Sequence, residues 1–442
     1  MRNSYFLNKD QTQLLILALP IIFGNLSQMM LNIIDALMVG QLGYKELAAS
    51  SLVNNILGIP FVACIGLTTA ISPIIAEYRG NMNHSASGRF LNNAVFSVIV
   101  ISVCIIFGIL IFGNIIYGLR QDPEVASLGK PFLNWMTWSI LPMIIYLSVK
   151  QFYDGLEQNR FPMIVSLGSI FLNTFLNYIL VFGHWGFPAM GLEGSGIATF
   201  ITRLIMVIVL LVHFYQFVPF KSYDIFNCKL SIMLIKKFLK ISLPSSWQYT
   251  SEIGAFVILA IIVGWFGAIQ QAAHHIAISI AAAAFMISMG LSTAGSIKVG
   301  QAMGSGDISL ARKFGFNALL LAFYYAIFVG ILFVLFRNVI PQAFTKEHEV
   351  IWIAGQLLLF AAAFQISDAL QAVGIGILRG MQDVKLPTLY TTLAYWGIGI
   401  PLGYFLANTL KWEVYGVWTG FIVCLTVMAF LLIARFNKIT QR

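Results

Sequence analysis

Three acidic residues of this 442-residue sequence fall inside long apolar runs: Asp35, Glu252 and Asp368. A carboxylate at membrane depth costs roughly 2.5–3.5 kcal/mol on insertion scales, and it usually faces an interior cavity and has a function. Burial favours its protonated form, whereas a bound cation favours its charged form. Such a group can therefore exchange a proton for Na⁺ or for an organic cation. The alternative is a protonated carboxyl group that is hydrogen-bonded to a neighbouring helix.

Other polar residues in apolar runs extend this chemistry. Asn173 and Asn177 are four residues apart, so they share one face of a helix, and their amide oxygens could complete an oxygen shell for Na⁺ around Asp35. Polar residues also hold membrane helices together, so this packing role stays open for either Asn. Arg203 is the one basic residue deep in an apolar run. It is either the counter-ion of a buried carboxylate or a side chain that reaches toward the membrane surface.

The composition requires that membrane helices position these residues. Hydrophobic residues make up 59% of the chain and charged residues 10%, against about 25% charged residues in soluble domains. The chain is therefore not an ordinary water-soluble protein, and we predict an all-α integral membrane fold with twelve transmembrane helices. The expected spans are 13–39, 47–76, 91–116, 131–152, 161–183, 192–217, 239–263, 272–297, 315–336, 354–378, 387–408 and 415–435.

The distribution of basic residues predicts the orientation. With the N-terminus in the cytoplasm, 19 Lys and Arg residues fall in cytoplasmic segments and 6 in external ones, as the positive-inside rule requires. Twelve spans then place both termini in the cytoplasm. The same rule accounts for the net charge of +9, so we expect a lipid bilayer and no nucleic acid as partner.

The two halves of the sequence repeat each other at a shift of 224 residues. Leu19-Pro20 falls on Leu243-Pro244, and the segment Gly66–Ser72 (GLTTAIS) falls on Gly290–Ser296 (GLSTAGS). One further residue of shift places Gly155 on Gly380. Two six-helix lobes in the same orientation follow, related by a pseudo-two-fold axis along the membrane normal, as in alternating-access transporters. We expect lobes at 1–218 and 239–442, with a cytoplasmic linker at 219–238.

The carboxylates do not follow this repeat. Asp35 falls on Leu259, and Glu252 falls on Gln28, so the lobes differ in their chemistry. A P-loop, a nucleophile elbow and a zinc-protease signature are lacking. We therefore expect a protein that is not an enzyme and has no cofactor, with an ion gradient as its energy source.

Several segments together resemble the multidrug and toxic compound extrusion (MATE) family, and in particular its bacterial NorM-type branch. The resemblance covers almost the whole chain. It rests on Asn32–Gly43, Leu172–Gly183, Gly191–Thr199, Leu243–Phe256, Lys298–Asp307 and Phe364–Asp383, of which the last is the most specific.

The resemblance implies a two-lobed, twelve-helix secondary active antiporter that exports organic cations or hydrophobic drugs in exchange for Na⁺ or H⁺. Similarity to the first-lobe cation site of the family nominates Asp35, Asn173, Asn177 and Thr199. Similarity to the second-lobe site nominates Glu252 and Asp368, with Phe364 as a substrate contact. Na⁺ is then a possible ligand of Asp35, Asn173, Asn177, Glu252 and Asp368.

The same resemblance implies a bacterial cytoplasmic (inner) membrane and a chain that works as a monomer. A related branch has Asp where Asn177 stands, which leaves the coupling ion open. Retention of both Glu252 and Asp368 favours Na⁺.

Other functions fit the sequence less well. A flippase for a lipid-linked sugar carrier is the main alternative, but it predicts extra spans and several cavity-lining arginines. An intramembrane enzyme for prenyl phosphates needs paired acidic motifs at a loop mouth, and Asp122 and Glu124 look like an ordinary outer turn that begins a helix. A channel does not need deep carboxylates in both lobes.

Overall fold

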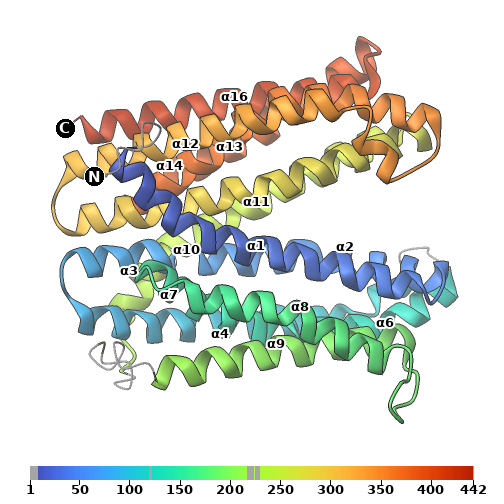
Figure 1. The fold of residues 1–442 in the computed structure, drawn as a ribbon, viewed down its shortest axis with the longest axis horizontal. Helices are drawn as coiled ribbons and strands as arrows, with labels where there is room; N and C mark the ends of the chain where they lie inside the picture. Colours follow the sequence, from blue (N-terminus) through green and yellow to red (C-terminus); the bar gives the residue numbers. More distant parts are fainter. Residues whose placement is uncertain (1–7, 119–121, 217–222, 224–228, 442) are drawn as a thin grey trace, which may run out of the picture. The chain divides into compact units, whose positions relative to one another are not determined.

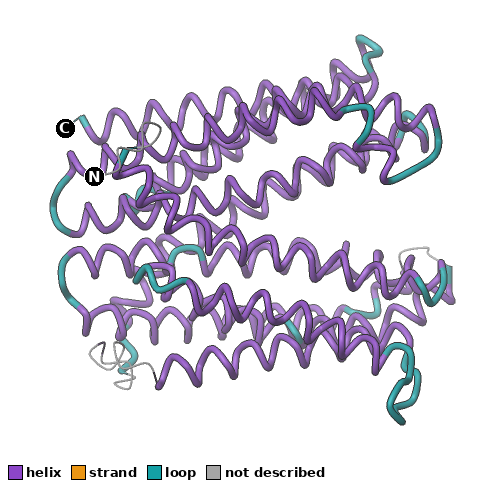
Figure 2. The backbone as a smooth tube through the Cα atoms, in the orientation of Figure 1, coloured by secondary structure: helices purple, strands orange, loops and turns teal. Residues whose placement is uncertain are grey.

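The computed structural model describes residues 8–118, 122–216, 223 and 229–441. Helices of each half run alongside one another (Figure 1), and Figure 2 shows helix and loop, but no strand, in the described part of the chain. The first half contains α1 (Lys9–Gly40), α2 (Tyr44–Thr68), α3 (Ile71–Gly80), α4 (His84–Phe112), α5 (Ile115–Gly118), α6 (Pro123–Trp138), α7 (Ile140–Gly155), α8 (Arg160–Leu180) and α9 (Gly191–Gln216).

The second half combines long helices with short helical segments. It contains α10 (Ile232–Gly264), α11 (Ala268–Gly304), α12 (Ile308–Phe336), η2 (Ile340–Ala343), α13 (His348–Gly380), α14 (Lys385–Thr392), η3 (Leu393–Gly399), α15 (Ile400–Tyr404), η4 (Phe405–Thr409) and α16 (Glu413–Thr440).

The predicted membrane spans are found as helices. Eleven helices in the described residues are long and apolar enough to cross a membrane. The span expected at 387–408 is the twelfth, and it is one helical run in which the π-helical segments η3 and η4 flank α15. Pro401, in α15, has no N–H to donate, so a regular α-helical ladder cannot continue through it. The chain is an all-α, multi-pass membrane protein, as predicted.

Helix bounds repeat in the two halves. α4 begins at His84 and ends at Phe112, and α12 begins and ends 224 residues later, at Ile308 and Phe336. The pair α2–α3 spans Tyr44–Gly80, and α11 spans the corresponding Ala268–Gly304. The internal repeat read from the sequence is thus also a repeat of helix order and length.

The chain forms two compact units. We call residues 23–246 the N-unit, and residues 8–22 together with 247–441 the C-unit. Each division lies inside a helix, two residues after Pro20 in α1 and two residues after Pro244 in α10. The linker predicted at 219–238 begins among residues outside the described ones, and the predicted lobe boundaries stay a prediction.

Small residues allow close helix packing within the C-unit. A Cβ atom on Gly420 of α16 would lie 2.7 Å from the backbone of Gly403 in α15 and 2.8 Å from the carbonyl oxygen of Gly399. Small residues at such contacts let membrane helices approach closely. This contact fixes the helical run that carries Tyr395, a residue of the C-unit site.

Candidate cation and substrate sites

Asp35 lies at the centre of a polar cluster in the N-unit. It comes from α1, and its partners come from α8 and α9. Asn177 Nδ2 donates to Asp35 Oδ1 at 2.6 Å, and Thr199 Oγ1 donates to Asp35 Oδ2 at 3.2 Å. Both carboxylate oxygens therefore accept from neutral donors. The structure brings together all four residues predicted for this site, the fourth being Asn173.

The carboxamide of Asn177 bridges two oxygen atoms. Its Nδ2 also donates to Asn173 Oδ1 at 3.0 Å, which the spacing of four residues allows. Asn177 is fully buried, and its own Oδ1 has no hydrogen-bond partner among the residues that the structure describes. Rotating this amide by half a turn would replace the bridging NH₂ group with an oxygen, next to those of Asp35 and Asn173. Three oxygens facing one point would suit a hard cation such as Na⁺.

The second cluster joins the two carboxylates of the C-unit. Gln371 and Asp368 lie one turn apart on α13, and Glu252 lies on α10. Gln371 Nε2 donates to Asp368 Oδ1 at 3.3 Å and to Glu252 Oε1 at 3.4 Å. The hydroxyl of Tyr395, in η3, donates to the same Glu252 oxygen at 3.2 Å. Glu252 and Asp368 thus converge across two helices.

A carboxamide plays the same part in both clusters. Like Asn177, Gln371 is buried, and its amide oxygen, Oε1, has no hydrogen-bond partner. In the described part of the chain, none of Asp35, Glu252 and Asp368 forms an ion pair. Each unit therefore holds buried carboxylates whose contacts are to neutral groups, beside an amide oxygen that lacks a partner.

The C-unit cluster opens into a small pocket between α10, α11 and α13. Its walls are Gln248, Tyr249, Glu252, Phe285, Met289, Ser292, Gln371, Ala372, Ile375 and Arg379. Asp368 lies behind this wall and reaches it through Gln371.

Phe364 and Arg203 have different surroundings. Phe364 is buried and packs against Trp418 and Phe421, with ring centroids 5.8 and 6.1 Å away, and it is not part of the pocket wall. Its role as a substrate contact stays a prediction. Arg203 reaches a protein partner: its Nη1 donates to Ser139 Oγ at 2.7 Å, and its guanidinium lies over the ring of Phe61 at 5.1 Å.

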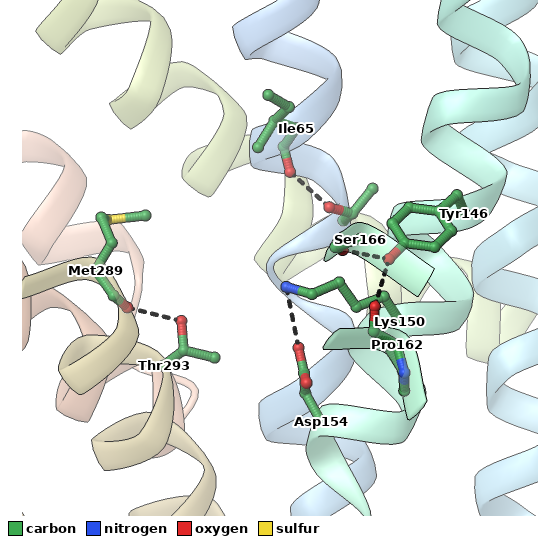
Figure 3. A network of polar contacts seen from close by, with 9 residues as sticks. Ile65, Tyr146, Lys150, Asp154, Pro162, Ser166, Met289 and Thr293 are labelled. Carbon is green, nitrogen blue, oxygen red and sulfur yellow. Dashed lines mark hydrogen bonds and ion pairs between the residues drawn. The ribbon is translucent and has the colours of Figure 1, made fainter. Parts of the chain in front are cut away.

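A further polar network lies in the N-unit (Figure 3). Lys150 and Asp154 on α7 form a buried ion pair at 3.6 Å. Tyr146 donates its single hydroxyl proton to the carbonyl of Pro162 at 3.0 Å, so Ser166 Oγ, 2.7 Å away, donates to Tyr146. Asp154 is not among the acidic residues predicted within the apolar runs, but its side chain is fully buried.

Sequence reasoning also missed Gln371, Tyr395 and Arg379. Gln371 and Tyr395 carry no charge, and nothing in their spacing connects them to Glu252. Arg379 has one signal in the sequence, because the repeat shift places Asp154 on it, so this position is charged in both halves.

Comparisons with known proteins agree with the resemblance seen in the sequence. The MatE family model matches residues 20–179 and 244–405. The probable multidrug resistance protein NorM of Mesorhizobium japonicum is 32% identical over 433 residues, covering 96% of this chain and 93% of that protein. The protein of the same name from Oceanobacillus iheyensis is 31% identical over 439 residues, covering 98% of each.

Solved structures have the same fold. The eukaryotic MATE transporter AtDTX14 is similar with a TM-score of 0.89 at 22% identity, covering 98% of both chains. A MOP superfamily transporter from Pyrococcus furiosus has a TM-score of 0.88 at 18% identity, covering 98% of this chain and 96% of that one. With the sequence matches over nearly its whole length, the chain belongs to the MatE family.

Proposed function

We propose that the chain is a secondary active multidrug efflux antiporter, not an enzyme, which exports organic cations or hydrophobic drugs in exchange for Na⁺ or H⁺ by alternating access. The observation that carries the proposal is the pair of buried carboxylate clusters, one in each unit, whose hydrogen bonds come from neutral donors. A buried carboxylate with a neutral environment gains stability from any cation that replaces water around it. The names of the relatives, probable multidrug resistance proteins, support the drug as cargo.

Exchange requires that the ion and the drug bind with negative coupling, and such coupling is reciprocal. In this proposal Na⁺ or a proton binds the carboxylates from the outside and lowers the affinity for the drug. The drug then leaves, the site becomes open to the cytoplasm, and the ion is released there. In this proposal Glu252 takes part in binding both the ion and the drug, because it belongs to the carboxylate cluster and to the pocket wall.

Na⁺ is the coupling ion that we favour. The amide oxygens of Asn177 and Gln371 are buried without a partner beside the carboxylates, and a proton would not need them. The amide rotation described above would make both oxygens cation ligands. No other cofactor is proposed.

We propose that the protein is located in the cytoplasmic membrane of a bacterium. Both termini then lie in the cytoplasm, and the chain acts as a monomer. A flippase for a lipid-linked sugar fits less well, because Arg379 is the only arginine on the wall of the described pocket.

The test is transport in proteoliposomes with a fluorescent organic cation, under a Na⁺ gradient or a pH gradient imposed separately. We expect the Na⁺ gradient to move the cation. Movement with the pH gradient alone would instead assign protons to the same carboxylates. If neither gradient moves the cation, the antiport proposal is wrong.

Glu252→Gln and Asp368→Asn should each abolish gradient-driven efflux without unfolding the protein. Each substitution removes a negative charge at nearly constant volume. Glu413→Gln is the matched control, because Glu413 lies at the exposed start of α16. Wild-type efflux by Glu252→Gln or Asp368→Asn, at equal membrane abundance, would remove that residue from the coupling site.

A further inference from the structure

Arg379 places a positive charge in the wall of the C-unit pocket. Its side chain is 7% exposed, and its Nε atom is buried with no hydrogen-bond partner. Its Nη2 donates to Gln248 Oε1 in a long hydrogen bond of 3.4 Å. A guanidinium in a pocket for cations is unexpected, and the proposed exchange of cations does not use it.

The position of Arg379 on α13 directs it into the pocket. Gln371, Ala372, Ile375 and Arg379 recur at helical spacing and line the same wall. Side chains on a helix lean toward its N-terminus, and the guanidinium contacts Gln248 and Tyr249 of α10. Its helix position thus explains why a residue in the last turn of α13 lines the pocket.

The pocket has charges of opposite sign at separate places. Glu252 and Arg379 both line it, but they do not form an ion pair among the described residues. Gln371 and Arg379 are eight residues apart, a rise of about 12 Å along the helix axis at the backbone. The two charges are thus too far apart for an ion pair but close enough to interact across the pocket.

The groups that contact the guanidinium directly are neutral, and Glu252 acts on it only from a distance. Gln248 and the ring of Tyr249, whose centroid is 5.6 Å from the Arg379 Cζ atom, are both neutral. Near Glu252, Gln371 Oε1 is a buried acceptor without a donor. A buried charge that lacks an ionic partner is costly, so an anion beside it would be favourable.

We propose that Arg379 binds an anionic group, such as a carboxylate, of the transported molecule. The pocket of the C-unit then takes amphoteric substrates, with their carboxylate at Arg379 and their ammonium group at Glu252 and Gln371 Oε1. Because the two ends of the pocket differ, such a substrate binds in one orientation. The inference rests on the proposed function for the role of this pocket in transport, but the binding itself needs no gradient.

The probe is para-(aminomethyl)benzoate, a small rigid molecule with an ammonium group and a carboxylate at opposite ends. Its methyl ester keeps the ring and the ammonium group and loses the negative charge. Affinities for the purified full-length protein are measured by titration calorimetry. Since hydrogen bonds to charged groups are the stronger ones, we expect the acid to bind at least about tenfold more tightly than the ester. Equal affinities, tighter binding of the ester, or no binding of the acid would overturn the proposal.

Variants test whether Arg379 causes the preference for the acid over the ester. Arg379→Gln should reduce the preference for the acid over the ester to less than about twofold, because the acid loses its charged partner. Arg379→Lys should retain part of it, because a lysine keeps the charge without the planar donor array. Arg435→Gln is the matched control: it removes the same charge from an ion pair with Asp383, away from the pocket, and should keep the full preference. A tenfold preference in Arg379→Gln would overturn the proposal.

Two further comparisons distinguish a failure of this inference from a failure of the proposed function. If Arg379→Gln does not fold, the comparison of acid and ester with the wild-type protein and Arg379→Lys still decides. If the acid binds as expected but no gradient moves any cation, the antiport proposal fails and the anion site stands.

Discussion

Asn177 and Gln371 have equivalent surroundings in the two units, since each donates its NH₂ group to two oxygens and leaves its own oxygen buried without a partner. Neither side chain titrates, so these bridges can change with pH only through the carboxylates that they contact. What changes with the bound ion, in our proposal, is the direction in which each amide points. The neighbouring carboxylates supply the negative charge, and each amide can turn either its NH₂ group or its oxygen toward the bound ion.

Replacing Asn177 with Asp should shift the coupling toward protons. Two carboxylates this close cannot both be ionised at low cost, so one of them would hold a proton that a pH gradient can move. We expect Asn177→Asp to gain efflux driven by a pH gradient, measured in proteoliposomes beside the Na⁺-driven efflux. Thr174→Val is the control on the same helix, because Thr174 Oγ1 donates to the Ile170 carbonyl of α8 itself. An unchanged ratio of the two activities would contradict this role of Asn177.

At the scale of helices, the glycine contact between α16 and α15 makes a strong prediction. A methyl group on Gly420 would lie 2.7 Å from the backbone of Gly403, which cannot rotate away as a side chain can. We expect Gly420→Ala to lower the stability by about 1–3 kcal/mol, as overpacked substitutions do, and to lower the melting temperature of the purified protein. Gly397→Ala is the control within the same helical run, since nothing lies within 4 Å of its added Cβ. Equal melting temperatures would show that the helices can separate without cost.

The first turn of α12 has a charged cap, whereas its repeat partner α4 has a neutral one. Asp307 Oδ1 accepts from Leu310 N at 2.8 Å and from Ser309 Oγ at 2.7 Å, and Asn83 Oδ1 accepts from Ala86 N at 3.1 Å. The backbone N–H of Leu310, followed by the hydroxyl of Ser309, holds the pKa of Asp307 below its ordinary value. The stabilisation by this cap is therefore present above the pKa of the unfolded chain and is lost as the pH falls through the lower pKa of the folded protein.

Asp307→Ala should consequently melt below wild type at neutral pH and approach it in acid, because the wild-type carboxylate is then protonated. Asn83→Ala should melt below wild type by an amount that does not change with pH. Thermal melting from neutral to acidic pH measures both. The same pH-independent difference for the two variants would show that the charge of Asp307 contributes nothing.

At the scale of the whole molecule, the distribution of basic residues predicts a topology that labelling can test. Ser305 precedes α12, and Lys346 lies beyond its other end, so one span separates them. In intact cells an impermeant thiol reagent should label Lys346→Cys and should not label Ser305→Cys until the membrane is opened. The reverse pattern would place the termini outside.

The sequence predicts much of this architecture and only part of the sites. Apolar run length and the 224-residue repeat are properties of the whole chain, so the membrane spans could be read without tertiary information. The cluster around Asp35 was predictable, because Asn173 and Asn177 have helical spacing and the family resemblance supplies the rest. Tyr395 and Gln371 were not, because their bonds to Glu252 join helices more than 100 residues apart through packing. Asp154 was missed because its burial depends on the helices around α7.

The bridging amides described above also offer a direct way to observe the protein at work. The side-chain NH₂ groups of Asn177 and Gln371 each carry two hydrogens in a defined environment, and their nitrogen can be isotopically enriched. Their NMR chemical shifts would therefore report, unit by unit, whether the amide points toward its carboxylate or away from it. Titrating Na⁺ against such a sample would show which of the two halves the ion enters first, without any drug and without a membrane gradient.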